Sequence, residues 1–234
     1  MRPELDPTHP HYYDKDYFDP DPQSSAPRKS SYRKGYSENS LWPIRFNLAA
    51  THIFWECLLG ETIRNKTVNI LDLGGAKGIL TKRLARFPGV KAVNLDFSGY
   101  ATQNTVYRQA TVCGDIRFMP FSSHSFDVLV SVDVLEHLPP NDVGRFLAEA
   151  KRVLRPQGKA FFVVAVKNEP FAQKDKSHLT LDDRNWWERE FQKGGFLLQN
   201  HLSVKIARRL GGFHPFGKVP IPTFREGLFV LARS

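Results

Sequence analysis

Short apolar runs alternate with helix-like segments along most of the chain. The runs are rich in β-branched and aromatic residues and are bounded by turn-forming residues, which is typical of buried strands. The strands expected on this basis are VNILDL (68–73), KAVNLDF (91–97), TVCGDI (111–116), FDVLVSV (126–132) and KAFFVVAV (159–166). Residues 79–87 and 142–154 carry apolar side chains at helical spacing. This alternation predicts an α/β fold with a doubly wound, mostly parallel sheet and helices on both faces.

Four more elements are expected outside this alternation. Residues 41–63 have apolar side chains at helical spacing and end at a glycine and an acidic turn. Residues 182–196 predict a second helix, closed by glycines. The segments 196–204 and 227–233 predict two final strands, joined by a long connection with several Pro and Gly residues. The sheet is therefore expected to have about seven strands, the last of them antiparallel.

The first part of the chain lacks helical or strand periodicity and is rich in Pro, Asp, Ser and Tyr. We therefore expect residues 1–40 to form a partly flexible N-terminal arm ahead of one domain over residues 41–234. Two interpretations of its aromatic patch stay open: it docks on the domain and covers a pocket as a lid, or it is a surface strap without a role in binding. The patch consists of Tyr12, Tyr13, Tyr17 and Phe18.

Composition narrows the setting. The 234 residues are 41% hydrophobic and 24% charged, which fits one globular domain with enough chain for a core. The two cysteines, Cys57 and Cys113, show neither a pairing signature nor metal-type spacing, which argues against a disulfide scaffold or zinc ribbon. No apolar run has the length of a membrane span, and the first residues lack the core of a secretory signal. We expect a cytoplasmic protein without membrane association.

The formal net charge of +9 raises nucleic acid as a partner. The excess of Lys and Arg lies late in the chain without forming one dense block, which is equally typical of a solvated basic face. RNA is therefore a secondary candidate partner. The basic residues concerned are Lys151, Arg152, Arg155, Lys159, Lys167, Lys174, Lys176, Lys205, Arg208, Arg209 and Lys218.

A glycine-rich turn follows the first expected strand, with the spacing D-x-G-x-A-x-G. A dinucleotide fingerprint requires G-x-G-x-x-G, so that backbone amides face a pyrophosphate. Here the third glycine comes one position early and a carboxylate precedes the turn, which would repel a pyrophosphate and favour a cationic amino-acid ligand. The residues of the turn are Asp72, Gly74, Gly75, Ala76 and Gly78.

From this turn onward the sequence resembles the class I methyltransferases that use S-adenosylmethionine and have a Rossmann-like fold. The segments MPFSSHSFDVLVSVDVLEHL and RVLRPQGKAFFVV are similar to signatures of their type 11 group. The resemblance implies that Asp96 accepts hydrogen bonds from the ribose hydroxyls, with Phe97 beside it, and that Asp115 and Ile116 lie at the adenine. It also implies that Ser131 and Val132 touch the cofactor. Ala76 replaces the usual middle glycine, a small change that fits a tight turn.

Methyl transfer needs a positioned acceptor and, where the acceptor carries a proton, a base. In similar enzymes the position of His137 faces the acceptor, so we expect this histidine to be the general base. His178, in the segment KSHLTLDDRNWW, is a second candidate. The alternative for His137 is a structural role, in which its ring caps the next helix or bonds a backbone carbonyl.

The residues Asp133, Glu136 and His137 are spaced D-x-x-E-H. Ubiquinone-pathway and small-RNA methyltransferases carry the similar E-x-x-E-H and can use a divalent cation there. His178 would be an extra ligand in such a site. Because E-H-L is common in metal-free relatives and Asp133 is shorter than the glutamate that it replaces, no residue is assigned to a metal.

Three functions remain open at this level. The first is transfer of a methyl group to an oxygen or nitrogen of a small molecule or glycan, with the arm and residues 205–226 forming the acceptor pocket. The second is ribose 2′-O methylation of RNA; the N/D-P-P-Y/F run of base-directed enzymes is absent, since the corresponding place reads SVDV. The third is a non-catalytic module that binds S-adenosylmethionine. Neither the acceptor nor the oligomeric state follows from the sequence.

Overall fold

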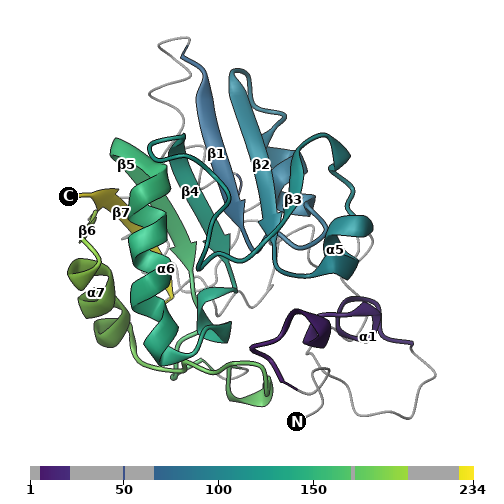
Figure 1. Cartoon of the computed structure of the whole chain (residues 1–234). Helices are drawn as coiled ribbons and strands as arrows, with labels where there is room; N and C mark the ends of the chain where they lie inside the picture. Colours follow the sequence, from purple (N-terminus) through teal and green to yellow (C-terminus); the bar gives the residue numbers. More distant parts are fainter. Residues whose placement is uncertain (1–5, 22–49, 51–65, 170–171, 200–226) are drawn as a thin grey trace, which may run out of the picture.

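The computed structural model describes residues 6–21, 50, 66–169, 172–199 and 227–234. A seven-stranded sheet forms its centre, in the order β3-β2-β1-β4-β5-β7-β6 (Figure 1). The strands are β1 (Val68–Leu73), β2 (Val90–Asp96), β3 (Thr111–Cys113), β4 (Phe126–Val132), β5 (Leu154–Val163), β6 (Phe196–Leu198) and β7 (Leu228–Arg233). The first five are paired in parallel, whereas β7 runs antiparallel between β5 and β6. The predicted fold class is confirmed.

The longer helices connect the strands and flank the sheet. The helices after the first strands are α4 (Ile79–Leu84), α5 (Gly99–Gln103), α6 (Pro140–Val153) and α7 (Arg184–Lys193). Near the N-terminus lie the 3₁₀ helix η2 (Pro10–Tyr12) and α1 (Lys15–Phe18), and further short 3₁₀ turns are η4 (Arg108–Ala110), η5 (Leu135–His137) and η6 (Ala172–Lys174). No helix in the described part of the chain has the length and apolar character needed to cross a bilayer.

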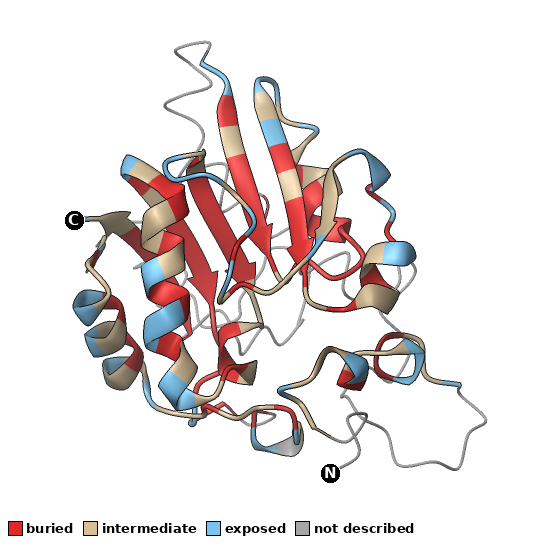
Figure 2. Cartoon of the chain, in the orientation of Figure 1, coloured by how far each residue is buried: buried red, intermediate tan, exposed pale blue. Residues whose placement is uncertain are grey.

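Two apolar clusters cover the two faces of the sheet, because successive side chains of a strand point to opposite faces. Ile70 of β1 packs in one cluster with Leu80 of α4. The adjacent Leu71 packs in the other with Phe146 of α6 and Trp187 of α7. Figure 2 shows the central strands as almost entirely buried. Helices therefore cover both faces, as the alternation of elements predicts.

Several elements differ in extent from those predicted. The strand expected over 159–166 starts earlier, at Leu154, because Leu154 pairs with Phe126 ahead of an irregularity in the ladder between β4 and β5. The strand expected over 111–116 is only three residues long. The helix predicted for 41–63 lies outside the described residues except at position 50, and so does the part of the 196–204 strand beyond residue 199.

The described N-terminal segment, residues 6–21, lies beyond the carboxyl ends of the parallel strands, close to α5 (Figure 1). Asp14 caps α1 by accepting a hydrogen bond of 3.1 Å from the backbone N–H of Tyr17. Tyr12, Tyr17 and Phe18 are buried in the cluster that contains Ile70. The aromatic patch is thus packed on the domain. Movement of this segment as a lid stays a prediction.

Candidate active site at the carboxyl ends of the strands

A cavity with about 810 Å³ of empty space opens at the carboxyl ends of β1, β2 and β4. In an open α/β sheet, ligands bind at this edge. The cavity wall brings together residues that are far apart in the sequence. The predicted site residues that line it are Gly74, Ala76, Asp96, Phe97, Asp115, Ile116, Val132 and His137.

The remaining predicted residues do not line the cavity. Ser131 of β4 is fully buried. The next residue, Val132, points to the opposite face of the sheet and lines the cavity. His178 does not line the cavity but packs against His137, with the two ring centroids 4.9 Å apart. The other three, Asp72, Gly75 and Gly78, belong to the glycine turn and the strand end before it, and they do not line the cavity.

Steric contacts explain the composition of the glycine turn. A Cβ on Gly75 would lie 2.3 Å from Oδ1 of Asn94 and 2.7 Å from Oδ2 of Asp72, so this position has no room for a side chain. Gly74 and Gly78 have φ values of 70° and 74°, which favour glycine. Ala76 adopts a φ of 49° and still lines the cavity. The alanine is therefore accommodated in the left-handed conformation that the turn requires.

Asp72 stabilises the glycine turn by linking the end of β1 to α4. Its Oδ2 accepts a hydrogen bond of 2.6 Å from Oγ1 of Thr81, at the start of α4. Burial raises the pKa of Asp72 to about 7, against the effect of the Thr81 hydroxyl. Because its carboxyl group is buried and is not part of the cavity wall, Asp72 acts on the conformation of the turn and makes no contact with the cavity.

Asp96, at the end of β2, joins the turn to the next loop. Its Oδ2 accepts a hydrogen bond of 2.7 Å from the N–H of Ala76, and its Oδ1 accepts one of 2.8 Å from the N–H of Ser98. Burial raises its pKa to about 6 even though both hydrogen bonds favour the charged form. A carboxylate oxygen can accept more than one hydrogen bond, so Asp96 keeps acceptor capacity toward the cavity.

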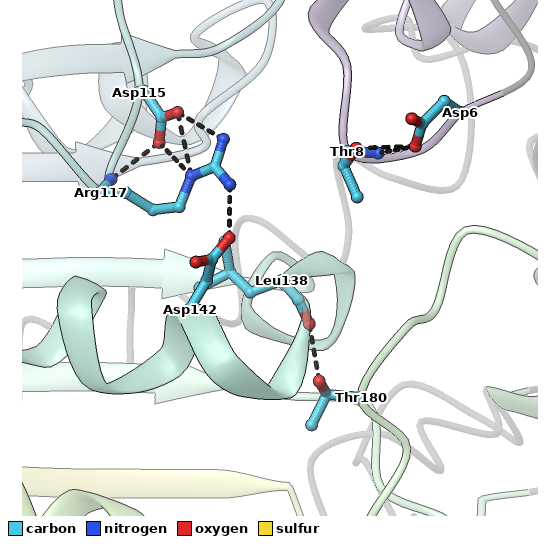
Figure 3. Close-up of polar contacts among 7 residues, drawn as sticks. All are labelled: Asp6, Thr8, Asp115, Arg117, Leu138, Asp142 and Thr180. Carbon is cyan, nitrogen blue, oxygen red and sulfur yellow. Dashed lines mark hydrogen bonds and ion pairs between the residues drawn. The ribbon is translucent and has the colours of Figure 1, made fainter. Parts of the chain in front are cut away.

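Arg117 is a cavity residue that the sequence reasoning missed. Its Nε donates to both carboxylate oxygens of Asp115 at 3.0 Å, and its Nη2 donates to Oδ2 of Asp115 at 2.7 Å. Its Nη1 donates to Oδ2 of Asp142, in the first turn of α6, at 2.5 Å (Figure 3). The guanidinium group thus neutralises Asp115 and ties the wall predicted for adenine to α6. The only local signal was the spacing of two residues between Asp115 and Arg117.

Backbone carbonyl groups orient the two histidines. Nδ1 of His137 lies 3.0 Å from the carbonyl oxygen of Ser177, and Nδ1 of His178 lies 2.7 Å from that of Ala172. A carbonyl oxygen only accepts, so both Nδ1 atoms carry a proton, and in the neutral form of His137 the lone pair lies on Nε2. Burial, followed by the neighbouring His178, lowers the pKa of His137 to about 4. His137 is therefore neutral near pH 7.

Glu136 forms a compact group with the two histidines. Its carboxyl group is fully buried, and burial, followed by the charge of Asp133, raises its pKa well above the usual value. One potential ligand atom from each of Glu136, His137 and His178 lies within 4.8 Å of the others. Asp133 is not part of this group; it lines the cavity with a φ of 55°. The structure therefore gathers E-H plus His178, and leaves out the first position of the D-x-x-E-H spacing.

The N-terminal segment supplies one wall of the cavity. Tyr13, Tyr17 and Phe18 line it together with Thr8, whose side chain is bonded to Asp6 (Figure 3). The ring of Tyr13 has centroid distances of 6.5 Å to Phe97 and 6.0 Å to His137, both with edge-to-face geometry. This one ring therefore touches both the residue beside Asp96 and the candidate base.

Comparison with known proteins identifies the domain. Residues 71–162 match the family model described as a methyltransferase domain. An uncharacterized protein of Methanocaldococcus jannaschii is 25% identical over 160 residues, which are 68% of this chain and 68% of that protein. The ubiquinone biosynthesis O-methyltransferase of Coxiella burnetii is 27% identical over 115 residues, or 46% of this chain. The chain spans 48% of the length of that enzyme.

A solved structure shows the same architecture. It is that of the Burkholderia thailandensis 1,6-didemethyltoxoflavin-N1-methyltransferase with bound 1,6-didemethyltoxoflavin and S-adenosylhomocysteine. The TM-score is 0.57 at 15% identity, and the match covers 83% of this chain and 81% of that one. At this identity the likeness concerns the fold alone. The family match covers residues 71–162, which hold the glycine turn, Asp96 and His137, so this part of the chain is a methyltransferase domain, and its sheet has the Rossmann-like fold of class I S-adenosylmethionine-dependent methyltransferases.

Proposed function

We propose that this enzyme transfers the methyl group of S-adenosylmethionine to a hydroxyl oxygen of a small-molecule acceptor. The observation that carries the proposal is the neutral ring of His137, whose Nδ1 is held by the Ser177 carbonyl group and which lines the same cavity as Gly74 and Asp96. A base and a cofactor cradle in one cavity are what transfer to a protonated acceptor requires.

The residues of the cavity fit S-adenosylmethionine. The buried carboxyl group of Asp96 retains acceptor capacity for ribose hydroxyls. The left-handed backbone at Gly74 and Ala76 brings the chain close to the cavity without a bulky side chain. Phe97 and Ile116 add apolar surface for a flat base. When bound, S-adenosylmethionine would supply an electrophilic methyl group on a cationic sulfur.

His137 would remove the proton of the acceptor hydroxyl. A pKa of about 4 makes its imidazole a weak base toward a free alcohol. The hydroxyl proton becomes strongly acidic as the oxygen forms its bond to the methyl carbon, so proton transfer to Nε2 is favourable late in the step. The Ser177 carbonyl group orients the ring for this transfer, and the N-terminal segment forms one wall of the cavity.

We also propose that Glu136, His137 and His178 can hold a divalent cation. Two imidazole nitrogens and one carboxylate oxygen suit Zn²⁺, Mn²⁺ or Fe²⁺, and the Nδ1 hydrogen bonds to carbonyl groups are the outer contacts that metal-bound histidines make. A cation there would polarise an acceptor oxygen. The same lone pair of His137 cannot both bind a cation and accept a proton, so these two roles exclude each other.

The test measures cofactor binding and turnover separately. Calorimetry with S-adenosylhomocysteine is combined with transfer of labelled methyl groups from S-adenosylmethionine to a panel of phenols, catechols, sugars and short RNAs. We expect His137→Asn, which keeps a donor for the Ser177 carbonyl group, to bind S-adenosylhomocysteine like the wild type and to lose turnover by about 10²-fold or more. Full turnover of this variant would contradict the base role.

Metal ions and salt separate the remaining alternatives. Turnover that is lost with a chelator and restored by Mn²⁺ or Zn²⁺, together with loss in His178→Asn, would favour the cation. Methylation confined to RNA, with RNA binding that weakens steeply as salt is added, would favour the RNA-directed alternative. The basic residues at 205–218 that raise this alternative lie outside the described part of the chain. Cofactor binding without transfer to any acceptor would favour the non-catalytic module. The cytoplasmic location stays a prediction.

A further inference from the structure

The N-terminal segment, residues 6–21, contacts two loops that hold the predicted cofactor residues, one through an ion pair and the other through a hydrogen bond. At the glycine turn, Lys77 forms an ion pair with Asp19. At the start of α5, the hydroxyl group of Ser98 donates a hydrogen bond to the carbonyl oxygen of Tyr13. Ser98 is 85 residues from Tyr13 in the sequence, so the fold alone brings these groups together.

Both loops contact Asp96 through their backbone. Lys77 stands between Ala76, whose N–H donates to Asp96, and Gly78, which caps α4. Ser98 itself donates its N–H to the other carboxylate oxygen of Asp96. The Asp96 carboxyl group therefore accepts hydrogen bonds from Ser98, which itself contacts the segment, and from Ala76, the residue before Lys77. The conformation of Asp96 and the position of the segment depend on the same two loops.

The attachment at Lys77 is partly removed from solvent. The side chain of Lys77 is only 11% exposed, and its ammonium group lies 5.6 Å from the ring centroid of Tyr100. The Tyr100 hydroxyl group donates a hydrogen bond of 2.8 Å to the same Asp19 carboxylate. A buried ammonium group is costly without a partner, so the pair favours the docked position of the segment.

We propose that docking of the N-terminal segment is coupled to cofactor occupancy, with Lys77 and Ser98 as positioning residues that connect the segment to the cofactor loops. The inference rests on the proposed function, in that it takes S-adenosylmethionine as the ligand of the cavity. Tyr13, Tyr17 and Phe18 share the cavity wall with Gly74 and Asp96. A ligand that touches both sides gains contacts only when the segment is docked, so binding shifts the segment toward the docked state. By reciprocity, weaker docking lowers the affinity for the ligand.

Hydrogen exchange on the full chain, followed by mass spectrometry, tests the coupling with S-adenosylhomocysteine as the probe. We expect saturating S-adenosylhomocysteine to slow exchange in residues 6–21 by about 10-fold. Asp19→Asn and Lys77→Met should each weaken binding of the probe about 3- to 10-fold and reduce this protection. The double variant should be no weaker than the worse single one, because both changes remove the same ion pair.

Matched controls separate coupling from general destabilisation. Asp16→Asn changes an exposed acid of the same segment, and Lys91→Met changes an exposed lysine of β2; both should leave affinity and protection unchanged. Asp19→Glu, which keeps the charge, should restore most of the coupling. Binding of S-adenosylhomocysteine with unchanged exchange in residues 6–21 would overturn the coupling alone. Absence of binding to the folded wild type would contradict the proposed function and, with it, this inference.

Discussion

The rings of His137 and His178 lie edge to face, with centroids 4.9 Å apart and an interplanar angle of 71°. Nδ1 of His137 lies at the carbonyl oxygen of Ser177, and Nδ1 of His178 lies at that of Ala172, the first residue of η6. Nδ1 of His137, which lines the cavity, therefore carries the proton, and Nε2 of its neutral ring is unprotonated. The backbone of residues 172–177 thus determines which nitrogen of the candidate base is free.

We expect His137 to remain neutral from pH 5 to pH 8. Burial disfavours its charged form, and a positive charge on His178 would disfavour it further, so the pKa lies near 4. Long-range ¹H–¹⁵N NMR should show a protonated Nδ1 and an unprotonated Nε2 throughout this range. The spectrum of His137→Asn assigns the signal. A midpoint near 6.5, or a proton on Nε2, would contradict the prediction.

The affinity for S-adenosylhomocysteine should depend on pH through Asp96. Burial raises the pKa of Asp96 to about 6 in the folded protein, and the ionised carboxylate is the better acceptor for ribose hydroxyls. Affinity is thus expected to rise with pH up to about 6 and to level off above it. Below pH 6 it should fall up to about 10-fold per unit. Calorimetry between pH 5 and pH 8 measures this profile.

Two variants serve as controls for that profile. Asp96→Asn should lower affinity about 10- to 100-fold and remove the dependence on pH near 6. Asp72→Asn removes a second carboxyl group with a raised pKa, about 7, and should keep the midpoint near 6 because Asp72 does not line the cavity. A midpoint that persists in Asp96→Asn would refute the assignment to Asp96.

Neighbouring positions in the glycine turn should respond in opposite ways. Gly75→Ala places a methyl group against the buried Asn94 and Asp72, and is expected to lower the free energy of unfolding by roughly 1–3 kcal/mol and to weaken cofactor binding. Ala76→Gly relieves a left-handed alanine and is expected to raise that free energy by up to about 1 kcal/mol. Urea unfolding of both variants measures the effect. Equal effects of the two substitutions would show that the turn has a different conformation.

Arg117 should contribute to cofactor affinity through its geometry as well as its charge. Arg117→Lys keeps the charge but loses the fork that binds Asp115 and Asp142 together, so we expect about 10-fold weaker binding of S-adenosylhomocysteine. Arg155→Lys is the matched control, since Arg155 is paired with Asp127 in the described structure and neither residue lines the cavity. Equal losses in both variants would attribute the effect to stability alone.

The sequence by itself determined the fold class and the outline of the cofactor site. Strands and helices leave local periodicities in the sequence, and the alternation of strands with crossover helices favours a parallel sheet. Because the carboxyl ends of parallel strands meet at one edge, Gly74, Asp96 and His137 had to lie near one another wherever the loops ran in detail. The confirmed mostly parallel sheet of seven strands follows from the same pattern.

Only the tertiary structure decided which side chains reach the cavity. The direction of a side chain at a strand end depends on where the strand stops, which separates Val132 in the wall from the buried Ser131. The position of the Arg117 guanidinium group between Asp115 and Asp142 depends on where α6 begins. The N-terminal wall depends on contacts across 58 residues to Lys77 and 85 residues to Ser98. Contacts of such separation leave no periodic signal, because they arise only when the chain packs.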